Sequence, residues 1–458
     1  MLLSRLETES DPRATAVIMQ LLAGLLVAGG AWAATIPELL EPRQWPVDPA
    51  LFNPRPSQDP WYKPGPGWEN KKPGEVLSIR NHAYRVPATF NYTDVIQVLF
   101  RTTDSHLQPS YAATTVFIPF SHARCLKGTN TTATECSHAL IAYQHPYDTS
   151  CFDASPSWAL QNKDPWGELT KGLSRGWFMS VPDYEGPRAS FGANLVAGRV
   201  ILDSLRALMA SMGQFGFRTD AARLAVWGYS SGGTASGWAL ELAEQYAPEL
   251  KLAGGVVGGM TANQTESSFL LNRRDVAGLL VQGLIGLTGE YPEARAYLDS
   301  RLKPTGRYNK TEWYIAQTMS ARDSMAHFVY QDVYQYFKGG EADVYTRNMT
   351  DLLEYEGTAG FKGTPRMSVL VHHSMSDEMC PYGSVNRVVD KWCKQGANIW
   401  YQRNTVGAHN RQLGYGQRTV LAYLDDILNN KNQTGYPAQG CKIEQVTVIH
   451  DEDVPFYT

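Results

Sequence analysis

A pentapeptide of the form G-x-S-x-G constrains this chain more than any other feature, because it stands between a predicted strand and a predicted helix. Residues 224–227 are all apolar, which is typical of a buried strand, and residues 234–247 have the pattern of a helix. The residues between them, 228–232, read G-Y-S-S-G. A strand, this turn and a helix in succession indicate a nucleophile elbow, which raises a serine hydroxyl above the edge of a sheet.

The glycines and the helix explain why this sequence suits such an elbow. A Cβ at Gly228 or Gly232 would crowd the turn, and the N-terminal dipole of the helix favours negative charge beside the serine. The pentapeptide also arises by chance in a chain rich in glycine and serine, but its flanking strand and helix favour a catalytic group. Only Ser230 lies at the centre of the glycine frame, so Ser230 rather than Ser231 is the predicted nucleophile.

Strands and helices alternate along most of the chain, which predicts an α/β fold with a largely parallel sheet flanked by helices. Further strands are predicted over residues 94–103, 114–120, 138–144, 177–182, 252–257, 368–372 and 399–404. Further helices are predicted over residues 194–212, 384–394 and 417–428. In such sheets the site lies at the carboxyl ends of the strands, where Ser230 already falls.

Residues 261–363 interrupt this alternation, because helical periodicity dominates there and strand signals are few. They are predicted to form a helical cap inserted between two parts of a hydrolase core, residues 76–260 and 364–458. The apolar face of the cap serves either plain core packing or a lid with an acyl pocket, and the pattern leaves both open. Residues 34–75 are rich in proline and are predicted to be an N-terminal arm.

The N-terminus has the pattern of a secretory signal peptide. Residues 16–30 are mostly apolar, and the A-W-A that follows is a small-x-small cleavage site. Residues 1–33 are therefore the predicted signal peptide, and the mature chain is predicted to be secreted and extracellular. The apolar stretch is too short for a membrane-spanning helix. Met19 is an alternative start, because the leader before residue 14 carries acidic residues.

Glycosylation motifs and cysteines agree with an extracellular chain. Six N-x-S/T sequons are present, of which only some are expected to be used: Asn91, Asn130, Asn263, Asn309, Asn348 and Asn432. The cysteines are even in number and contain no C-x-x-C, which favours disulfides over a metal site: Cys125, Cys136, Cys151, Cys380, Cys393 and Cys441.

Charge and the chain ends exclude several classes of partner. The net charge of −4, with 41 basic and 45 acidic residues and no basic tract, gives no electrostatic footprint for nucleic acid. The polar C-terminus lacks the hydrophobic tail of a lipid-anchor signal. We expect no metal, no cofactor and no transmembrane anchor, and we expect a monomer.

The candidate catalytic groups follow the predicted strands in a meaningful order. A serine hydroxyl needs a base to take its proton, and that base needs a carboxylate to fix its tautomer. In hydrolases with this elbow the chain order is serine, acid, histidine. Asp377 follows the strand after the cap and His409 follows the last predicted strand, so Ser230, Asp377 and His409 are the predicted triad. Glu378 competes directly with Asp377 for the role of the acid. The non-catalytic alternative for Asp377 is to cap a loop.

Other histidines fit the role of base less well. His372 and His373 precede the acid and are expected to be structural, while His450 lies in a polar tail with no strand to position it. An oxyanion also needs preorganised donors, of which the backbone N–H of Ser231 is predicted to be the first. The second is expected from the loop at residues 144–149, which has no His-Gly-Gly-Gly motif.

Short motifs are spread over nearly the whole mature chain. They are A-Y-Q at 142–144 with Y-D at 147–148, V-P-D-Y-E-G at 181–186, G-Y-S-S-G-G at 228–233, D-E at 377–378 with P-Y at 381–382, K-Q-G-A-N-I at 394–399 and A-H at 408–409. Together they resemble the fungal and bacterial secretory lipases of the α/β-hydrolase fold, a family related to Candida antarctica lipase A. The resemblance implies the same triad, oxyanion positions at Asp148 and Ser231, and a helical cap that shapes the acyl pocket.

The sequence departs from the family pattern at two places. Ser231 stands where the family usually has glycine, and Met379-Cys380 stands where it has Ile-Val. Neither change removes a catalytic group, but both alter the rim of the pocket, which leaves substrate length open.

The family resemblance implies a partner for only two of the six cysteines. It matches Cys393 and Cys441 to a disulfide of the family. A disulfide between Cys125 and Cys136 would close a short loop, and a bond between the remaining Cys151 and Cys380 is a hypothesis.

The leading functional prediction is a secreted serine carboxylic-ester hydrolase of the triacylglycerol lipase type, acting through an acyl-enzyme. The alternative is an esterase or deacetylase of a small acylated metabolite, since the relatives implied by the resemblance include fungal trichothecene deacetylases. The apolar helices of the cap favour the lipase, and the altered rim of the pocket favours the esterase of a small metabolite. A catalytically dead hydrolase used as a binding module would show a broken triad, which this chain does not.

Overall fold

The computed structural model describes residues 54–81, 92–122, 138–160, 167–429, 437 and 439–449. All of them belong to one compact unit, which spans Phe52–Thr458. The predicted signal peptide, the alternative start at Met19 and much of the proline-rich arm lie outside the described residues. Among the helices of the described part, none is long and apolar enough to cross a lipid bilayer.

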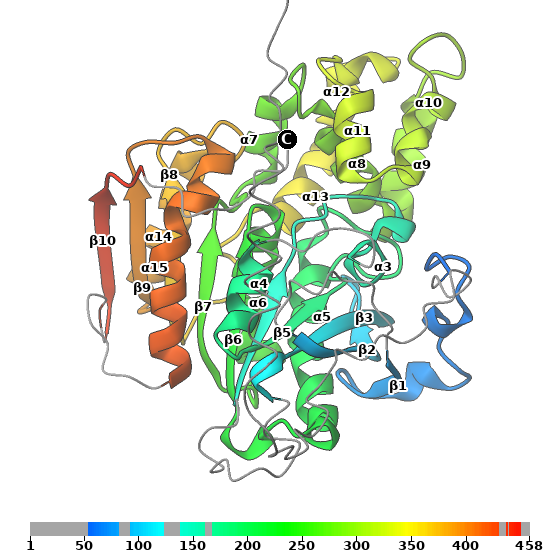
Figure 1. The fold of residues 1–458 in the computed structure, drawn as a ribbon. Helices are drawn as coiled ribbons and strands as arrows, with labels where there is room; N and C mark the ends of the chain where they lie inside the picture. The colour runs from blue at the N-terminus through cyan, green and yellow to red at the C-terminus, as the bar shows by residue number, and fades with distance from the viewer. Residues whose placement is uncertain are drawn as a thin grey trace, which may run out of the picture. The chain divides into compact units, whose positions relative to one another are not determined.

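Within the described residues, ten strands form one sheet in the order β1-β2-β3-β5-β4-β6-β7-β8-β9-β10 (Figure 1). Their bounds are β1 (Val76–Asn81), β2 (Tyr92–Thr103), β3 (Pro109–Pro119), β4 (Ala139–Gln144), β5 (Phe178–Pro182), β6 (Arg223–Tyr229), β7 (Leu252–Gly258), β8 (Ser368–Ser374), β9 (Asn398–Asn404) and β10 (Cys441–Val446). The pairs β1·β2, β2·β3 and β3·β5 are antiparallel, and every pair from β5 to β10 is parallel. The predicted α/β fold with a mostly parallel sheet is confirmed.

Helices cover both faces of the sheet, which explains why its central strands are continuously apolar. On one face lie α5 (Asn194–Ser211), α6 (Ser231–Tyr246) and α14 (Tyr382–Lys394), and on the other lie α4 (Gly167–Ser174) and α15 (His409–Asn429). Successive side chains of β6 alternate between these two cores. Leu224 and Val226 pack in the first, and Ala225 and Trp227 pack in the second.

Seven helices occupy the connection between β7 and β8, with no strand among them. They are α7 (Gln264–Leu271), α8 (Ala277–Glu290), α9 (Pro292–Arg301), α10 (Lys310–Tyr314), α11 (Ala321–His327), α12 (Glu341–Val344) and α13 (Arg347–Gly357). They gather at the end of the sheet toward which β7 points (Figure 1), and most of them share a hydrophobic core of their own. This is the segment that the sequence predicts as a cap, and its action as a lid stays a prediction.

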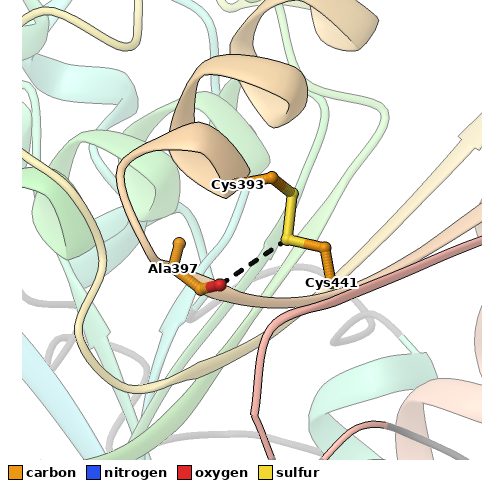
Figure 2. Close-up of a disulfide and its surroundings, with 3 residues drawn as sticks. All are labelled: Cys393, Ala397 and Cys441. Carbon is orange, nitrogen blue, oxygen red and sulfur yellow. Dashed lines mark hydrogen bonds between the residues drawn. A yellow bond between two sulfur atoms is a disulfide. The ribbon is translucent and has the colours of Figure 1, made fainter.

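The strand β10 was not predicted, because the sequence analysis takes residues 399–404 for the last strand. That expectation is wrong: Cys441–Val446 pairs parallel with β9 along its whole length. In β10 side chains alternate between exposed and half-buried, which is the pattern of a polar edge strand rather than an apolar one. A disulfide of 2.02 Å from Cys441 to Cys393 at the end of α14 fastens this edge (Figure 2).

Candidate active site

The elbow holds Ser230 in a backbone conformation that few residues adopt. Its φ is 58° and its ψ is −126°, and its N–H donates to Gly258 O at 3.0 Å. A Cβ at Gly228 would come within 2.2 Å of Gly232 O, and one at Gly232 within 2.0 Å of Gln144 O. Strain of this kind clusters at functional sites, and here it places the Ser230 hydroxyl at the carboxyl end of β6.

A chain of hydrogen bonds joins Ser230 to a histidine and a carboxylate from distant parts of the sequence. His409 Nε2 lies 2.9 Å from Ser230 Oγ, and His409 Nδ1 lies 2.7 Å from Asp377 Oδ2. Asp377 stands in the loop after β8, and His409 is the first residue of α15, after β9. The structure thus brings the three predicted residues together at the carboxyl ends of β6, β8 and β9, which are parallel strands of one sheet, with the hydrogen-bond contacts that an activated serine nucleophile needs.

The Asp377 carboxylate is held on both of its oxygens. Its Oδ1 accepts the backbone N–H groups of Met379, at 3.0 Å, and Cys380, at 2.7 Å, while Oδ2 faces His409. Burial alone would raise the pKa of Asp377, but the charge and hydrogen bond of His409 outweigh it and lower that pKa. The group is therefore preorganised as a carboxylate that faces the imidazole.

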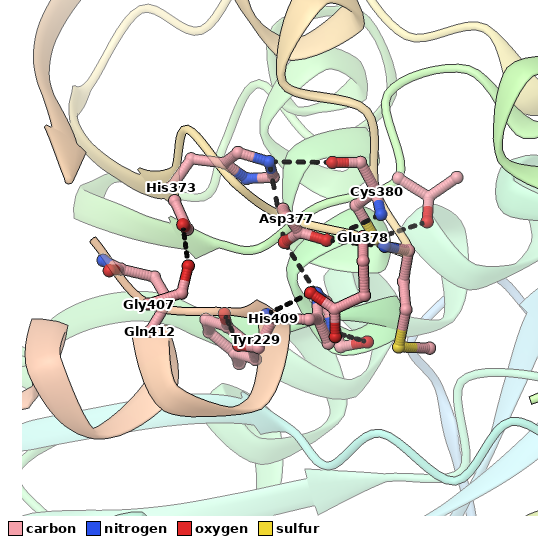
Figure 3. A network of polar contacts seen from close by, with 12 residues as sticks. Tyr229, His373, Asp377, Glu378, Cys380, Gly407, His409 and Gln412 are labelled. Atoms are coloured by element: carbon pink, nitrogen blue, oxygen red, sulfur yellow. Dashed lines mark hydrogen bonds and ion pairs between the residues drawn. The ribbon is translucent and has the colours of Figure 1, made fainter. Parts of the chain in front are cut away.

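Glu378, the competitor of Asp377, contacts the main chain instead of the ring. Its Oε2 accepts the backbone N–H of His409 at 2.9 Å, which caps the first turn of α15. From the other side the Tyr229 hydroxyl donates to His409 O at 2.6 Å (Figure 3). These contacts fix the backbone of His409, so both carboxylates position the same residue while only Asp377 reaches its side chain.

The environment of His409 favours its protonated form. Burial disfavours the imidazolium, yet the neighbouring Cys380 and Asp377 side chains raise the pKa of His409 well above its usual value. His373 behaves oppositely: burial lowers its pKa, and its Nε2 lies 3.0 Å from Cys380 O. Burial also lowers the pKa of His372 to about 3. Both histidines are buried within the site, while His450, which the sequence disfavours as the base, lies outside the described residues.

The two predicted oxyanion residues contact each other. Asp148 has a φ of 46°, and its carboxylate accepts a hydrogen bond from the Ser231 hydroxyl, which also lies 3.1 Å from Tyr184 Oη. Ser231 is the first residue of α6, so its N–H lacks an intrahelical acceptor. The Ser231 side chain therefore links the two predicted oxyanion positions to each other.

A second carboxyl group, for which the sequence predicts no role, lies beside Asp148. Glu185 is buried, its backbone N–H donates to Tyr147 Oη at 2.6 Å, and burial together with the charge of Asp148 raises its pKa well above the usual value. Glu185 belongs to the V-P-D-Y-E-G motif, so a signal was present, but only the fold brings that motif next to residues 147–148.

A cavity of about 110 Å³ opens beside Ser230. Asp148 and Ser231 line one part of it, and its apolar part includes Phe191 together with Leu280 and Leu284 of α8. A cavity of about 150 Å³ holds one benzene molecule. In this conformation the space is therefore about the size of one small ring, and much of its wall is apolar.

The proposed disulfide between Cys151 and Cys380 is wrong. Cys151 and Cys380 are both buried free thiols, so the structure does not join them. The reason is local: Cys380 Sγ lies 3.2 Å from Thr261 Oγ1 and contacts His409, and Cys151 instead begins the short 3₁₀ turn at Phe152–Ala154. The Cys393–Cys441 bond implied by the family resemblance is present. Cys125 and Cys136 lie outside the described residues.

Three of the predicted sequons fall within the described residues. Asn348 is exposed. The side chains of Asn263 and Asn309 each accept a hydrogen bond at the N-terminus of a helix, from Glu266 N and Glu312 N. Asn91, Asn130 and Asn432 lie outside the described residues.

Comparison with known proteins identifies the family. The family model described as "Secretory lipase" matches residues 167–435. A trichothecene C-3 esterase of Fusarium sporotrichioides is 36% identical over 406 residues, 86% of this chain and 88% of the esterase. Lipase A of Arthroderma benhamiae is 31% identical over 408 residues, 85% of this chain and 82% of that lipase.

The fold comparison agrees. The crystal structure of Candida antarctica lipase A superposes with a TM-score of 0.73 at 21% identity, covering 87% of this chain and 90% of the lipase. The resemblance stated from the sequence motifs is confirmed. This chain belongs to the secretory lipase family and is a hydrolase of the lipase and esterase type.

Proposed function

We propose that this protein is a secreted serine esterase that removes a short acyl group from a small metabolite, of the trichothecene type. The hydrogen-bonded series Ser230, His409 and Asp377 beside a cavity of about 110 Å³ carries the proposal. The sequence pattern alone favours a triacylglycerol lipase. The small cavity and the higher identity to the trichothecene esterase, 36% against 31% to the lipase, support the alternative better.

The proposed reaction uses the triad in two symmetrical halves. Ser230 Oγ attacks the ester carbonyl carbon while its proton passes to His409 Nε2, and the resulting imidazolium is stabilised by Asp377. The tetrahedral intermediate collapses, the C–O bond of the leaving alcohol breaks, and that alcohol takes the proton from His409. Water then repeats the sequence on the acyl-enzyme, which releases the carboxylic acid and restores the Ser230 hydroxyl.

The oxyanion of each intermediate is proposed to face the backbone N–H groups of Asp148 and Ser231. Loss of one such donor typically costs about 3 to 4 kcal/mol of transition-state stabilisation. The side-chain hydrogen bond between these two residues supports their positions. Glu185 and Tyr184 lie behind them and are proposed to fix the loop that carries Asp148.

One experiment separates the two substrate classes. Purified protein and its Ser230→Ala variant are assayed on p-nitrophenyl acetate, butyrate, octanoate and palmitate, and on a trichothecene acylated at C-3. We expect kcat/KM to be highest for acetate or butyrate, with the trichothecene ester hydrolysed, and no activity in Ser230→Ala. Activity that survives in the variant would exclude the triad.

A long-chain lipase remains the second candidate, because α8 contributes leucines to the wall of the cavity. The same assay decides: a kcat/KM that rises from acetate to palmitate would overturn the short-acyl proposal and support the lipase. The leucines would then line an acyl channel that widens when α8 moves.

Secretion is proposed from the family and from the signal-like N-terminus. N-terminal sequencing of protein secreted by a fungal host is expected to start near residue 34. Of the three sequons in the described part, Asn348 is the proposed glycan site, since the other two use their side chains as helix caps. Glycopeptide mapping that finds Asn348 unmodified and Asn263 occupied would contradict this.

A further inference from the structure

A thiol lies against the catalytic histidine, and the mechanism proposed above does not use it. Cys380 stands where related sequences were expected to carry valine, and it is buried at 3% exposure yet lines the cavity beside Ser230. One possible ligand atom each from Asp377, Cys380 and His409 lies within 4.8 Å of the others, and all three residues are buried (Figure 3). Thiolate, imidazole and carboxylate are the ligand types that bind Zn²⁺ in proteins.

We propose that Asp377, Cys380 and His409 form an inhibitory site for a soft divalent cation of the Zn²⁺ type. The bonds formed are from the metal to Cys380 Sγ, to a nitrogen of His409 and to a carboxylate oxygen of Asp377. The thiol loses its proton to water, since a coordinating thiol is deprotonated by the metal. A water molecule or the Ser230 hydroxyl completes a tetrahedral set.

The distances fit such a site after small side-chain rotations. Zn–N and Zn–S bonds of about 2.0 to 2.3 Å place tetrahedral ligand atoms roughly 3.5 Å apart, and the three atoms here lie within 4.8 Å. Outer contacts are already present: the Thr261 hydroxyl lies 3.2 Å from Cys380 Sγ, and two backbone N–H groups hold Asp377. Partners of this kind orient metal ligands.

Metal binding would inhibit the enzyme whichever nitrogen of His409 it takes. Nε2 faces Ser230 Oγ and Nδ1 faces Asp377, so both nitrogens are occupied in the catalytic arrangement. A metal on Nε2 removes the base that accepts the serine proton, and a metal on Nδ1 separates the base from its carboxylate. Soft ligands also predict selectivity, because Mg²⁺ and Ca²⁺ prefer oxygen and bind a thiolate poorly.

The first test measures inhibition. Hydrolysis of p-nitrophenyl acetate is followed against free Zn²⁺ for wild type, Cys380→Ser and Cys380→Val, each normalised to its own metal-free rate. Cys151→Ser is the matched control, since it removes the other buried free thiol. We expect Zn²⁺ to inhibit wild type and Cys151→Ser equally, with EDTA restoring activity, and the Cys380 variants to need about 100-fold more Zn²⁺. Equal inhibition of the Cys380 variants, or inhibition that EDTA does not reverse, would overturn the proposal.

The second test needs no catalysis, so it remains decisive if the proposed function fails. Co²⁺ is titrated into the Ser230→Ala protein and into the Ser230→Ala/Cys380→Ser protein. A thiolate-to-cobalt charge-transfer band in the first and its absence in the second are expected. Co²⁺ that binds without this band would show that Cys380 is not a ligand.

Discussion

Replacing Asp377 with asparagine tests the role of this carboxylate more directly than any other change. The substitution keeps the shape of the side chain and removes its charge, while its Oδ1 can still accept the N–H groups of Met379 and Cys380. The imidazolium that forms at His409 during the reaction would lose its counter-charge. With the charge centres roughly 4 Å apart and an effective dielectric constant near 20, that interaction is worth about 4 kcal/mol.

A loss of about 4 kcal/mol lowers kcat by about 10³-fold, since each 1.36 kcal/mol is a factor of ten. The pH profile supplies a second readout. The neighbouring Cys380 and Asp377 side chains raise the pKa of His409, and the neutral imidazole is the form that accepts the serine proton. The activity of the wild type therefore rises with pH through a pKa above the usual histidine value. In Asp377→Asn this acid limb is expected to move to lower pH while the plateau falls.

The assay is kcat and kcat/KM on p-nitrophenyl acetate as a function of pH, with near-ultraviolet circular dichroism to verify the fold. Glu378→Gln is the matched control, because Glu378 is the adjacent carboxylate and contacts only the main-chain N–H of His409. We expect that control to lose no more than about tenfold, because the glutamine carbonyl oxygen can still accept the same N–H and a neutral hydrogen bond is worth about 1 kcal/mol. If Glu378→Gln loses as much as Asp377→Asn, or if the acid limb of Asp377→Asn does not move, the reasoning is refuted.

Three further changes test other parts of the site and the fold. Ser231→Ala removes the hydroxyl that holds the Asp148 carboxylate and is expected to lower kcat about tenfold with little change in KM; an unchanged kcat would show that this contact does not organise the oxyanion position. Leu280→Ala widens the cavity and is expected to raise kcat/KM for octanoate relative to acetate. It is also expected to lower the free energy of unfolding, measured with urea, by about 2 to 5 kcal/mol. An unchanged octanoate-to-acetate ratio would show that α8 does not bind the acyl group. Removing the bond between Cys393 and Cys441 with a double serine variant opens a loop of 48 residues, which lowers the free energy of unfolding by up to about 4 kcal/mol; an unchanged urea midpoint would show that β10 holds without it.

The sequence predicted those parts of the site that each follow directly from a predicted strand. Ser230, Asp377 and His409 each come next to an apolar run, and runs of this kind end at the same edge of a parallel sheet. Residues whose neighbours are set by tertiary packing were not predictable in this way. Glu185 stands in the V-P-D-Y-E-G motif and Cys380 follows the D-E motif, but neither motif shows what these residues contact, because their surroundings arise only when the loops after β4, β5 and β8 meet.

Two expectations from the sequence were wrong, for different physical reasons. The pairing of Cys151 with Cys380 rested on nearness to active-site loops, but a disulfide depends on the direction of two Cβ atoms, which a sequence does not encode locally. The strand β10 was not predicted because an edge strand has only one neighbouring strand and needs little apolar surface, so its sequence lacks an apolar run.

The side chain of Gln282 on α8 ties the loop after β4 to the helices above it. Its Oε1 accepts from Ser150 N at 2.8 Å and from Ser150 Oγ at 2.5 Å, and its Nε2 donates to Ala316 O at 2.9 Å. Ser150 is two residues from Asp148, so a movement of α8 that admitted a bulky substrate would also pull on the proposed oxyanion position. Entry to the site and the ability to stabilise a transition state are then thermodynamically linked. A conformation open enough to bind a large lipid would have a lower kcat. Small esters that enter without this opening would keep the full kcat.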